Sequence, residues 1–377
     1  MRRVGVSFAV AACWVLCLLA PAGADDSLPK NGKIAFSIFQ VEDSRYDIYA
    51  VNPDGSSLNR LSTIASSTYY AQSAWSPDGT KLAFVDEEHI WVMDADGSNL
   101  RVLTLNNSDL SNFSDPAWSP DGKKLAFTGF SEPNSLASAD IYTMDVDGSN
   151  LTNLTMSPGV SEGGIDFSPD GSQICLGRSI QEIPAGADAL RVLRKNGICV
   201  MNADASNPTQ VTNSHAGGCA WSPDGKTIAY TYEQPKQRGA TIQDFDVYVM
   251  NADGSEKTNL TSNRNWDAKP NREAEAGPEW SPNGRRIAFR SNRDGDLDGS
   301  YTSDIYTMDA DGSDVVQVTK TPSIDDSLPD WQPLTPKSRS MTVDQLKDTG
   351  GPSLLWVASA LLFSGGVMFC VAVKRSL

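Results

Sequence analysis

The sequence predicts an all-β fold, a closed ring of six units with four short strands each, and three observations predict it. The motif Trp-Ser-Pro-Asp-Gly or a close variant begins at positions 75, 118, 167, 221 and 280, so it returns every 40 to 60 residues or roughly so. A second motif, Asp-Ala-Asp-Gly-Ser and its variants, begins at positions 52, 94, 145, 202, 251 and 309. The third observation is a truncated copy of the first motif, Asp330–Pro333, which ends the series.

Each unit contains four β-type runs separated by turns. An apolar run such as Leu82–Phe84 follows the first motif, another such as Ile141–Tyr142 precedes the second motif, and a pair such as Leu154–Thr155 follows it. In the first motif the Pro fixes φ, the Asp side chain accepts hydrogen bonds from its own turn, and the Gly takes a positive φ. Four-stranded units at this spacing are typical of β-propeller blades. We therefore assign turn formation to the acids of both motifs.

The two ends of the repeated region predict that the ring is closed. The region starts at Lys33–Phe36, which matches the second strand of a unit, and it ends at Asp330–Trp331, which matches a first strand. The C-terminal strand should therefore complete the N-terminal blade. This gives a six-bladed β-propeller over residues 25–335 and removes the exposed edges of an open array.

These motifs resemble a known repeat. The series Trp-Ser-Pro-Asp-Gly, Ile-Ala-Phe, Ile-Tyr and Asp-Ala-Asp-Gly-Ser is similar to the WD40-like (PD40) repeat of TolB-type β-propellers, and the resemblance covers all six units. It implies the propeller fold. It implies no single function, because that repeat occurs in colicin-import and envelope-integrity proteins, peptidase accessory domains and lyases.

Composition excludes some classes of function. Acids outnumber bases by 47 to 31, for a net charge of −16, and such a surface repels phosphate backbones, so we expect no nucleic-acid binding. The chain has two histidines, too few for His-rich metal chemistry, and it contains neither a Gly-x-Ser-x-Gly elbow nor a phosphate-binding glycine loop. We therefore expect that the protein is not an enzyme.

The two ends of the chain predict export and anchoring. Residues 1–24 fit a signal peptide with a charged start, an apolar stretch and an Ala-Gly-Ala cleavage site. Residues 353–373 form an uncharged run long enough for a transmembrane helix. The basic tail 374–377 follows, which predicts that the tail stays cytoplasmic and the propeller lies outside. We expect the protein at the outer face of the cytoplasmic membrane or in the cell wall.

A short stalk, residues 336–352, precedes this run and contains Leu346–Pro352, which resembles a degenerate sortase sorting signal. The resemblance implies a sortase as partner and cleavage after Thr349, with attachment to the wall. Lys347 stands where that family has Pro. The alternative is a plain membrane anchor.

One long loop predicts a calcium site. Its sequence Asp-Gly-Asp-Leu-Asp-Gly places Asp294, Asp296 and Asp298 at the spacing of a Ca²⁺-binding loop, in which carboxylates surround a hard cation and the Gly allows a sharp bend. The usual Glu at the twelfth position is Ile305, and we expect Asp304 to substitute for it. The alternative is a solvated acidic loop.

Two cysteines of the fourth blade predict a disulfide. If a three-residue turn joins the second and third strands of the second blade, Ala83 lies opposite Trp91, and Cys175 and Cys199 occupy the corresponding positions of the fourth blade. Directly opposed residues on antiparallel strands are close enough for a bridge, which export permits. The alternative is two free buried thiols, and Cys219 would remain unpaired in either case.

The long loops are all expected on one face, the top face, where binding residues of a rigid scaffold usually lie. Trp266 lies in such a loop outside the repeat and is a candidate contact. The fourth blade also carries a basic cluster that either contacts an acidic partner or is a solvated face, namely Arg178, Arg191, Arg194 and Lys195.

Together these features predict a surface-tethered, non-catalytic module that binds a protein or a cell-envelope polymer. The alternative is a metal-assisted hydrolase or lyase with its site at the mouth of the channel on the top face.

Overall fold

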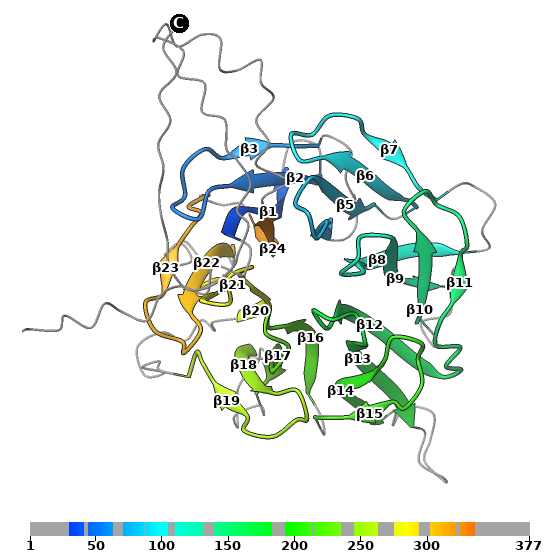
Figure 1. Cartoon of the computed structure of the whole chain (residues 1–377). Helices are drawn as coiled ribbons and strands as arrows, with labels where there is room; N and C mark the ends of the chain where they lie inside the picture. The colour runs from blue at the N-terminus through cyan, green and yellow to red at the C-terminus, as the bar shows by residue number, and fades with distance from the viewer. Residues whose placement is uncertain are drawn as a thin grey trace, which may run out of the picture. The chain divides into compact units, whose positions relative to one another are not determined.

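The six predicted blades surround a central axis (Figure 1). The computed structural model describes residues 30–40, 44–62, 71–86, 88–104, 110–130, 139–182, 193–212, 215–234, 245–262, 275–293, 302–321 and 325–335. These residues form six four-stranded antiparallel sheets, which confirms the predicted fold. We number the blades 1 to 6 around the ring and give their strands from the axis outward.

Blade 1 contains β24 (Asp326–Leu334), β1 (Lys30–Gln40), β2 (Arg45–Val51) and β3 (Asn59–Arg60). Blade 2 contains β4 (Ser73–Trp75), β5 (Lys81–Val85), β6 (Ile90–Asp94) and β7 (Arg101–Val102). Blade 3 contains β8 (Ser111–Trp118), β9 (Lys124–Phe130), β10 (Ala139–Asp145) and β11 (Thr152–Asn153). Blade 4 contains β12 (Val160–Phe167), β13 (Gln173–Glu182), β14 (Leu193–Asn202) and β15 (Thr209–Gln210). Blade 5 contains β16 (Ala216–Trp221), β17 (Thr227–Glu233), β18 (Phe245–Asn251) and β19 (Thr258–Asn259). Blade 6 contains β20 (Glu275–Trp280), β21 (Arg286–Ser291), β22 (Asp304–Asp309) and β23 (Val316–Gln317).

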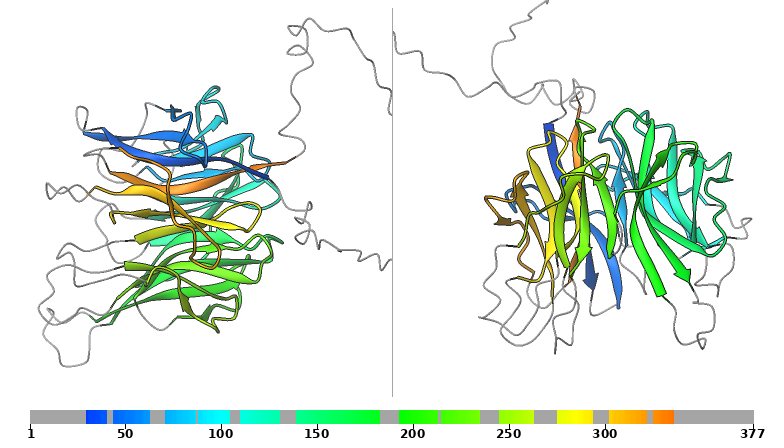
Figure 2. Two further views of the ribbon diagram at one scale, coloured as in Figure 1. Left: turned by 90° about the vertical axis from the view of Figure 1, so that its left-hand side faces the viewer. Right: turned by 90° about the horizontal axis from the view of Figure 1, so that it is seen from below.

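The ring is closed in blade 1, where β24 pairs antiparallel with β1 and lies next to the axis. In blade 1 the first turn motif comes from two parts of the chain: its first residues belong to the end of β24 and its last residues to the start of β1. Gln332 accepts a hydrogen bond from the Lys33 N–H at 3.2 Å, as Ser76 does from the Lys81 N–H at 2.9 Å in blade 2. Lys30 pairs with Leu334, so both ends of the described chain leave the same face (Figure 2).

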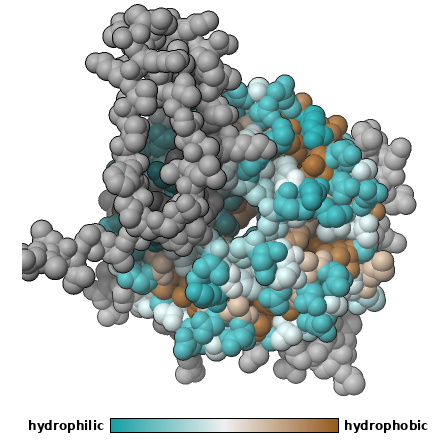
Figure 3. Space-filling view, viewed as in Figure 1, coloured by the Kyte–Doolittle hydropathy of each residue, from teal (hydrophilic) through white to brown (hydrophobic). Residues whose placement is uncertain are grey.

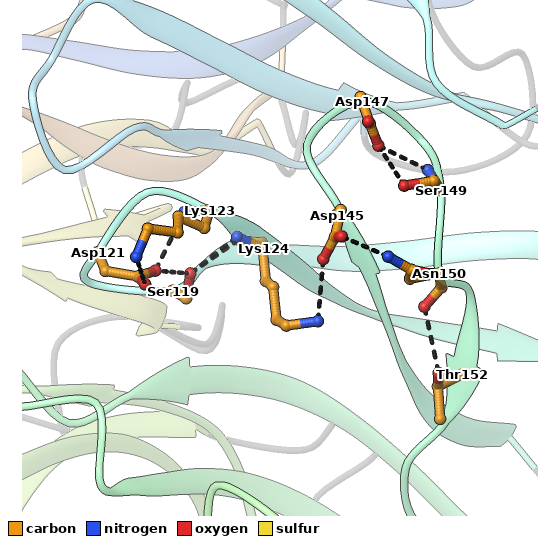
Figure 4. A network of polar contacts seen from close by, with 9 residues as sticks. All are labelled: Ser119, Asp121, Lys123, Lys124, Asp145, Asp147, Ser149, Asn150 and Thr152. Atoms are coloured by element: carbon orange, nitrogen blue, oxygen red, sulfur yellow. Dashed lines mark hydrogen bonds and ion pairs between the residues drawn. The ribbon is translucent and has the colours of Figure 1, made fainter.

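The acids of the repeated motifs form turns, as predicted, and blade 3 shows how (Figure 4). The Asp121 carboxylate accepts hydrogen bonds from the Ser119 hydroxyl at 2.8 Å and the Lys123 N–H at 3.1 Å. In the second turn the Asp147 carboxylate accepts the N–H and the hydroxyl of Ser149 at 2.9 and 2.6 Å. Hydrogen bonds to the ionised form, the Ser119 bond first, lower the pKa of Asp121 to about 2.

The second turn also joins neighbouring blades. Gly97 has φ +89° and lies so close to blade 1 that a Cβ would stand 2.7 Å from the Leu61 carbonyl oxygen. Gly312 has φ +86°, and a Cβ there would lie 2.7 Å from the Leu260 carbonyl oxygen in the same way. Glycine is required at such a position, since a side chain would meet backbone in a left-handed conformation. Blade 4 is the exception among the described turns, because Ala205 occupies this place at φ 64°.

The hydrophobic core lies between adjacent sheets. The aromatic residue of each Ile-Ala-Phe segment is buried completely, as at Phe36, Phe84 and Phe127. Each packs among residues of its own and a neighbouring blade, so that Phe84 shares a cluster with Ala35 and Leu61 of blade 1. Burial of such side chains, at about 25 cal/mol per Å² of apolar surface, holds the ring together.

The predicted disulfide pairing was wrong. Cys175 on β13 is bonded to Cys219 on β16, with 6.3 Å between the Cα atoms, and so links blades 4 and 5. Cys199 is a free, buried thiol. The error is a shift of one residue in register: Cys175 lies opposite Val200 in blade 4, as Ala83 lies opposite Val92, and not Trp91, in blade 2. A shift of one residue turns a side chain to the other face of the sheet.

Several predicted segments lie outside the described residues and stay predictions. They are the signal peptide (1–24), the stalk with its sortase-like signal (336–352), the membrane span (353–373) and the basic tail (374–377). In the part of the chain that is described, no helix is long and apolar enough to cross a membrane.

Candidate functional site in the central channel

The innermost strands of all six blades line a cavity of about 270 Å³ on the axis of the ring. Figure 3 shows the hollow at the centre of one face of the molecule. The lining runs from Gln72 and Asp115 to Pro77 and Pro333, which are the prolines of the first turn motif in blade 2 and of its truncated copy in blade 1. The cavity therefore lies on the inner strands themselves, whereas the long loops expected to carry binding residues largely fall outside the described residues.

A bulge shapes the inner strands around this cavity. The residue three places before the motif aromatic has a positive φ at Asp115, Gly164, Gly218, Gly277 and Leu328. The glycines permit close approach, since a Cβ on Gly164 would stand 3.0 Å from the Gly218 Cα. Blades 2 and 3 are linked by Gln72 and Asp115. The Gln72 side-chain amide donates a hydrogen bond to the Asp115 carboxylate, and the Asp115 N–H donates one to the Gln72 side-chain oxygen. Bulges of this kind direct side chains toward a site.

Three carboxylic acids face the cavity from equivalent positions, directly before the motif aromatic: Asp166, Glu279 and Asp330. Asp330 accepts a hydrogen bond from the Trp75 N–H at 2.5 Å, and Asp166 accepts one from the Trp221 N–H at 2.6 Å. Each of these two acids therefore also links its blade to the next one.

Burial changes the acidity of these groups. Desolvation raises the pKa of Asp166 and of Asp330 to about 7, although the tryptophan N–H bonds act in the opposite direction. Burial raises the pKa of Glu279 well above its usual value, and the charges of Asp166 and Asp330 raise it further. The three acids thus oppose one another's ionisation. A cation or a proton in the cavity would relieve this repulsion.

The same three strands carry a second buried acid four residues earlier, namely Glu162, Glu275 and Asp326. Glu162 forms an ion pair with Arg178 at 3.0 Å and Glu275 forms one with Arg293 at 2.6 Å. The inner strands of blades 3 and 5 have apolar residues at both of these positions, and blade 2 has Ala74 at the position nearer the motif. The blades therefore differ at these two positions of the inner strand: blades 1, 4 and 6 have an acid at both, whereas blades 3 and 5 have apolar residues at both.

Asp304, the one predicted calcium ligand that is described, begins β22. Its carboxylate accepts hydrogen bonds from the Gln317 amide at 2.8 Å and the Thr321 N–H at 3.1 Å, and burial raises its pKa. Asp140 and Asp246 are the second residues of the third strands of blades 3 and 5, and each accepts a hydrogen bond from an asparagine amide of the fourth strand at 2.8 Å. Linking the third and fourth strands is thus a shared role of these acids.

The other predicted ligands, Asp294, Asp296 and Asp298, lie outside the described residues, and the loop site stays a prediction. Among the described residues, no three His, Cys, Asp or Glu side chains are grouped so that they could hold a metal ion.

Of the four residues of the predicted basic cluster, Arg178 is the one whose side chain is described. Arg178 is engaged in the ion pair with Glu162, and its side chain is 26% exposed. Arg194 and Lys195 lie on β14 opposite Gln181 and Ile180. Arg191 and Trp266 lie outside the described residues, so their roles as contacts stay predictions.

The channel acids were missed by sequence reasoning, which assigned the motif acids to turns and passed over the residue before each motif. The signal is present there: that residue is Ala in blades 2, 3 and 5 and Asp or Glu in blades 1, 4 and 6. A polar residue that replaces Ala in half of the copies of a repeat indicates a role beyond the shared fold.

Comparison with known proteins finds partial matches to β-propeller proteins, TolB among them. Residues 40–135 match the model of the dipeptidyl peptidase IV N-terminal region. An uncharacterized protein of Agrobacterium fabrum is 29% identical over 168 residues, which cover 44% of this chain and 45% of that protein. The Tol-Pal system protein TolB of Rhizorhabdus wittichii is 38% identical over 92 residues, or 24% of this chain and 18% of that protein. The chain therefore matches less than half the length of these curated relatives.

Solved structures show the same fold. TolB from Acinetobacter baumannii superposes with a TM-score of 0.60 at 19% identity and covers 82% of this chain and 69% of that chain. Hydrazine synthase from Kuenenia stuttgartiensis superposes with a TM-score of 0.61 at 15% identity, over 81% of this chain and 47% of that one. At these identities the likeness establishes the fold of the chain and leaves its ligand open.

Proposed function

We propose that this protein is a surface-tethered, non-catalytic binding module whose channel receives a cationic group of a protein or cell-envelope polymer. The observation that carries the proposal is the placement of three carboxyl groups, Asp166, Glu279 and Asp330, around one cavity on the axis of a closed ring.

The chemistry of the cavity favours a positively charged ligand. Its three acids repel one another when ionised, and an ammonium or guanidinium group between them would stabilise the ionised forms. Trp75 and Trp331 line the same cavity and offer apolar surface to the carbon stem of such a group. A cavity of about 270 Å³ is large enough for one side chain but not for a folded domain. The ligand would thus be a side chain or sugar amine presented by a larger partner.

The proposed location supports an envelope partner. The Cys175–Cys219 bond and the likeness to TolB suggest an extracytoplasmic protein. The predicted stalk (336–352) and membrane span (353–373) follow Thr335 in the sequence. By analogy with the relative named for the Tol-Pal system, we place the partner in the cell envelope.

One observation favours the enzymatic alternative. Carboxyl groups with a pKa of about 7, as at Asp166 and Asp330, are suited to general acid–base catalysis at neutral pH. A hydrolase or lyase that uses them would have its site in the channel as well.

Affinity capture with a charge-neutral channel tests the proposal. The full chain and an Asp166→Asn, Glu279→Gln, Asp330→Asn variant would be purified in mild detergent, immobilised and exposed to solubilised envelope of the native host. We expect an envelope component that only the native channel retains and that high salt releases. Equal retention by both chains would contradict the role of the channel, and turnover of envelope polymer by the native chain alone would favour the enzyme.

A further inference from the structure

Glu162, Glu275 and Asp326 are the second buried acids of blades 4, 6 and 1. Two of them form an ion pair with an arginine, whereas Asp326 forms none with any described residue. Glu162 lies opposite Arg178 on the neighbouring strand, and Glu275 is bonded to Arg293. Asp326 occupies the same position in blade 1, but its cross-strand neighbour on β1 is Ile38. The repeat thus builds an internal ion pair into blades 4 and 6 and omits it from blade 1.

Asp326 is fully buried, with 0% of its surface exposed. Within the described chain, neither of its carboxylate oxygens has a partner with good hydrogen-bond geometry, although the hydroxyls of Thr319 and Thr321 lie near them. An ionised carboxylate that is removed from water without a partner is destabilising by several kcal/mol. The site therefore calls for either a proton or a cation from solution.

The polar side chains that act on Asp326 are the hydroxyls of Thr319 and Thr321 and the carboxylates of Asp304 and Asp325, and they supply few protons. The hydroxyls of Thr319 and Thr321 approach the carboxylate, yet both also lie within 3.4 Å of the Asp304 carboxylate, at 3.4 and 3.3 Å. A hydroxyl has one proton and satisfies one acceptor at a time. The Ser327 hydroxyl, also buried, has no partner among the described residues.

We propose that Asp326, together with Asp304 and the hydroxyls of Thr319 and Thr321, forms a site for a hard cation at the junction of blades 1 and 6, with Ca²⁺ as the expected ion. The donors are carboxylate and hydroxyl oxygens without nitrogen or sulfur, which are the ligands of Ca²⁺ rather than of Zn²⁺ or Cu²⁺. The ion takes the place that the guanidinium groups of Arg178 and Arg293 hold beside the equivalent acids.

The site has a structural consequence, because β24 is the strand that closes the ring. Asp304, Thr319 and Thr321 belong to blade 6 or follow its last strand, and Asp326 begins β24. A cation between them joins blade 6 to the closing strand. Calcium binding should therefore stabilise the closed propeller.

Thermal unfolding of the full chain in detergent, with EDTA or with calcium, tests the proposal. At a hundredfold excess over its dissociation constant, calcium should raise the Tm of the native chain by about 5 °C. Asp326→Asn should unfold at an equal or higher temperature than the native chain in EDTA, because it removes an unpaired charge, and it should not respond to calcium. The control Asp311→Asn, an exposed turn acid of blade 6 outside both the channel and the proposed site, should keep the full response.

A second variant restores the missing internal cation. Ile38→Arg places a guanidinium opposite Asp326, as Arg178 lies opposite Glu162. It should fold, lose the calcium response and remain as stable in EDTA as the native chain is in calcium. A response that persists in Asp326→Asn and disappears in Asp296→Ala would assign calcium to the predicted loop and overturn the proposal. The absence of any response in the native chain would overturn it too, and neither result bears on binding of a cationic partner in the channel.

Discussion

The turn motifs and the channel place the same residue type, aspartate, in opposite electrostatic environments. Asp121 is exposed in a turn, where a hydroxyl and N–H groups lower its pKa to about 2. Asp330 faces the channel two residues after the bulge, where burial raises its pKa to about 7. The turn acids are nearly identical in every blade, whereas the channel acids occur in blades 1, 4 and 6.

This contrast separates residues that build the blade from residues that distinguish one blade from another. A turn acid stabilises the fold wherever the repeat occurs, so each copy retains it. A channel acid is unfavourable to the fold when it is ionised, because it is desolvated beside two others. Three such residues at equivalent positions of a repeat are better explained by binding than by stability.

The largest expected effect lies in the layer of buried ion pairs. Arg293→Ala removes the guanidinium that lies 2.6 Å from the carboxylate of Glu275, which is 0% exposed. Loss of one member of a buried pair should lower the free energy of unfolding by about 3–5 kcal/mol. Urea unfolding would measure it. Arg285→Ala, an exposed arginine of the same blade, is the control and should change stability by about 0.5 kcal/mol at most. Equal effects would show that the pair contributes nothing.

The next largest effect concerns the disulfide that links blades 4 and 5. Cys175→Ala removes the bond to Cys219, across 44 residues of sequence, and should lower the free energy of unfolding by about 2–4 kcal/mol. Reduction of the native chain should give a similar loss. Cys199→Ala should leave the response to reductant intact, since Cys199 is a free thiol. A non-reducing peptide map that shows Cys175 joined to Cys199 would contradict the assigned pairing.

The pH dependence of stability tests the contrast most directly. Since the pKa of Asp330 is raised from 3.8 to about 7, the folded state holds a proton that the unfolded state has lost between these values. Stability should therefore fall as pH rises through this window, by up to about 1.4 kcal/mol per pH unit for one proton. Asp330→Asn should flatten the profile between about pH 4 and 7 and raise stability at neutral pH.

Asp121→Asn is the matched control from the turns, and its sign is opposite. The pKa of Asp121 is lowered from 3.8 to about 2, so its stabilising contribution is present above the ordinary value and is lost as pH falls toward 2. The variant should lose stability at neutral pH and alter the profile only below about pH 4. Profiles of the two variants with the same sign would refute the distinction between the two regions.

The fold was predictable because its evidence is local and repeated. Each turn motif specifies its own hydrogen bonds, as Ser119 and Asp121 show, and Lys33–Phe36 and Asp330–Trp331 together indicated the closure of the ring. The register of a hairpin was less predictable. Val85 lies opposite Ile90 with four residues between them, where three were expected. The same register in blade 4 places Val200, and not Cys199, opposite Cys175.

The channel acids were not predicted because they meet only after the ring has closed. Asp330 and the Trp75 N–H that it accepts are 255 residues apart in sequence. Nothing in the local pattern distinguishes Asp330 from a turn acid until its neighbours in space are known. The comparison of equivalent positions between blades is the one sequence signal that would have identified these residues.

The smallest effect tests whether the turns follow one rule in every blade. Ala205 takes the place of a glycine at φ 64°, and its N–H bonds to the Asn202 carbonyl oxygen at 2.8 Å, as the Gly97 N–H bonds to Asp94 at 2.8 Å in blade 2. The turn is thus unchanged, and the alanine is held in a left-handed conformation. Ala205→Gly should relieve this strain and raise the free energy of unfolding by about 0.5–1 kcal/mol, after the greater entropy of glycine in the unfolded chain is subtracted.

Gly97→Ala is the reverse substitution and should be destabilising, because its φ is +89° and the new Cβ would lie 2.7 Å from the Leu61 carbonyl oxygen. Urea unfolding of both variants would give the two values under one condition. If Ala205→Gly instead lowers stability, the Cβ of Ala205 contributes more through packing than it loses through strain. Ala205 and Leu154 pack against the same apolar cluster between blades 3 and 4. At that junction an apolar side-chain contact would then replace the close backbone contact that glycine makes in the other blades.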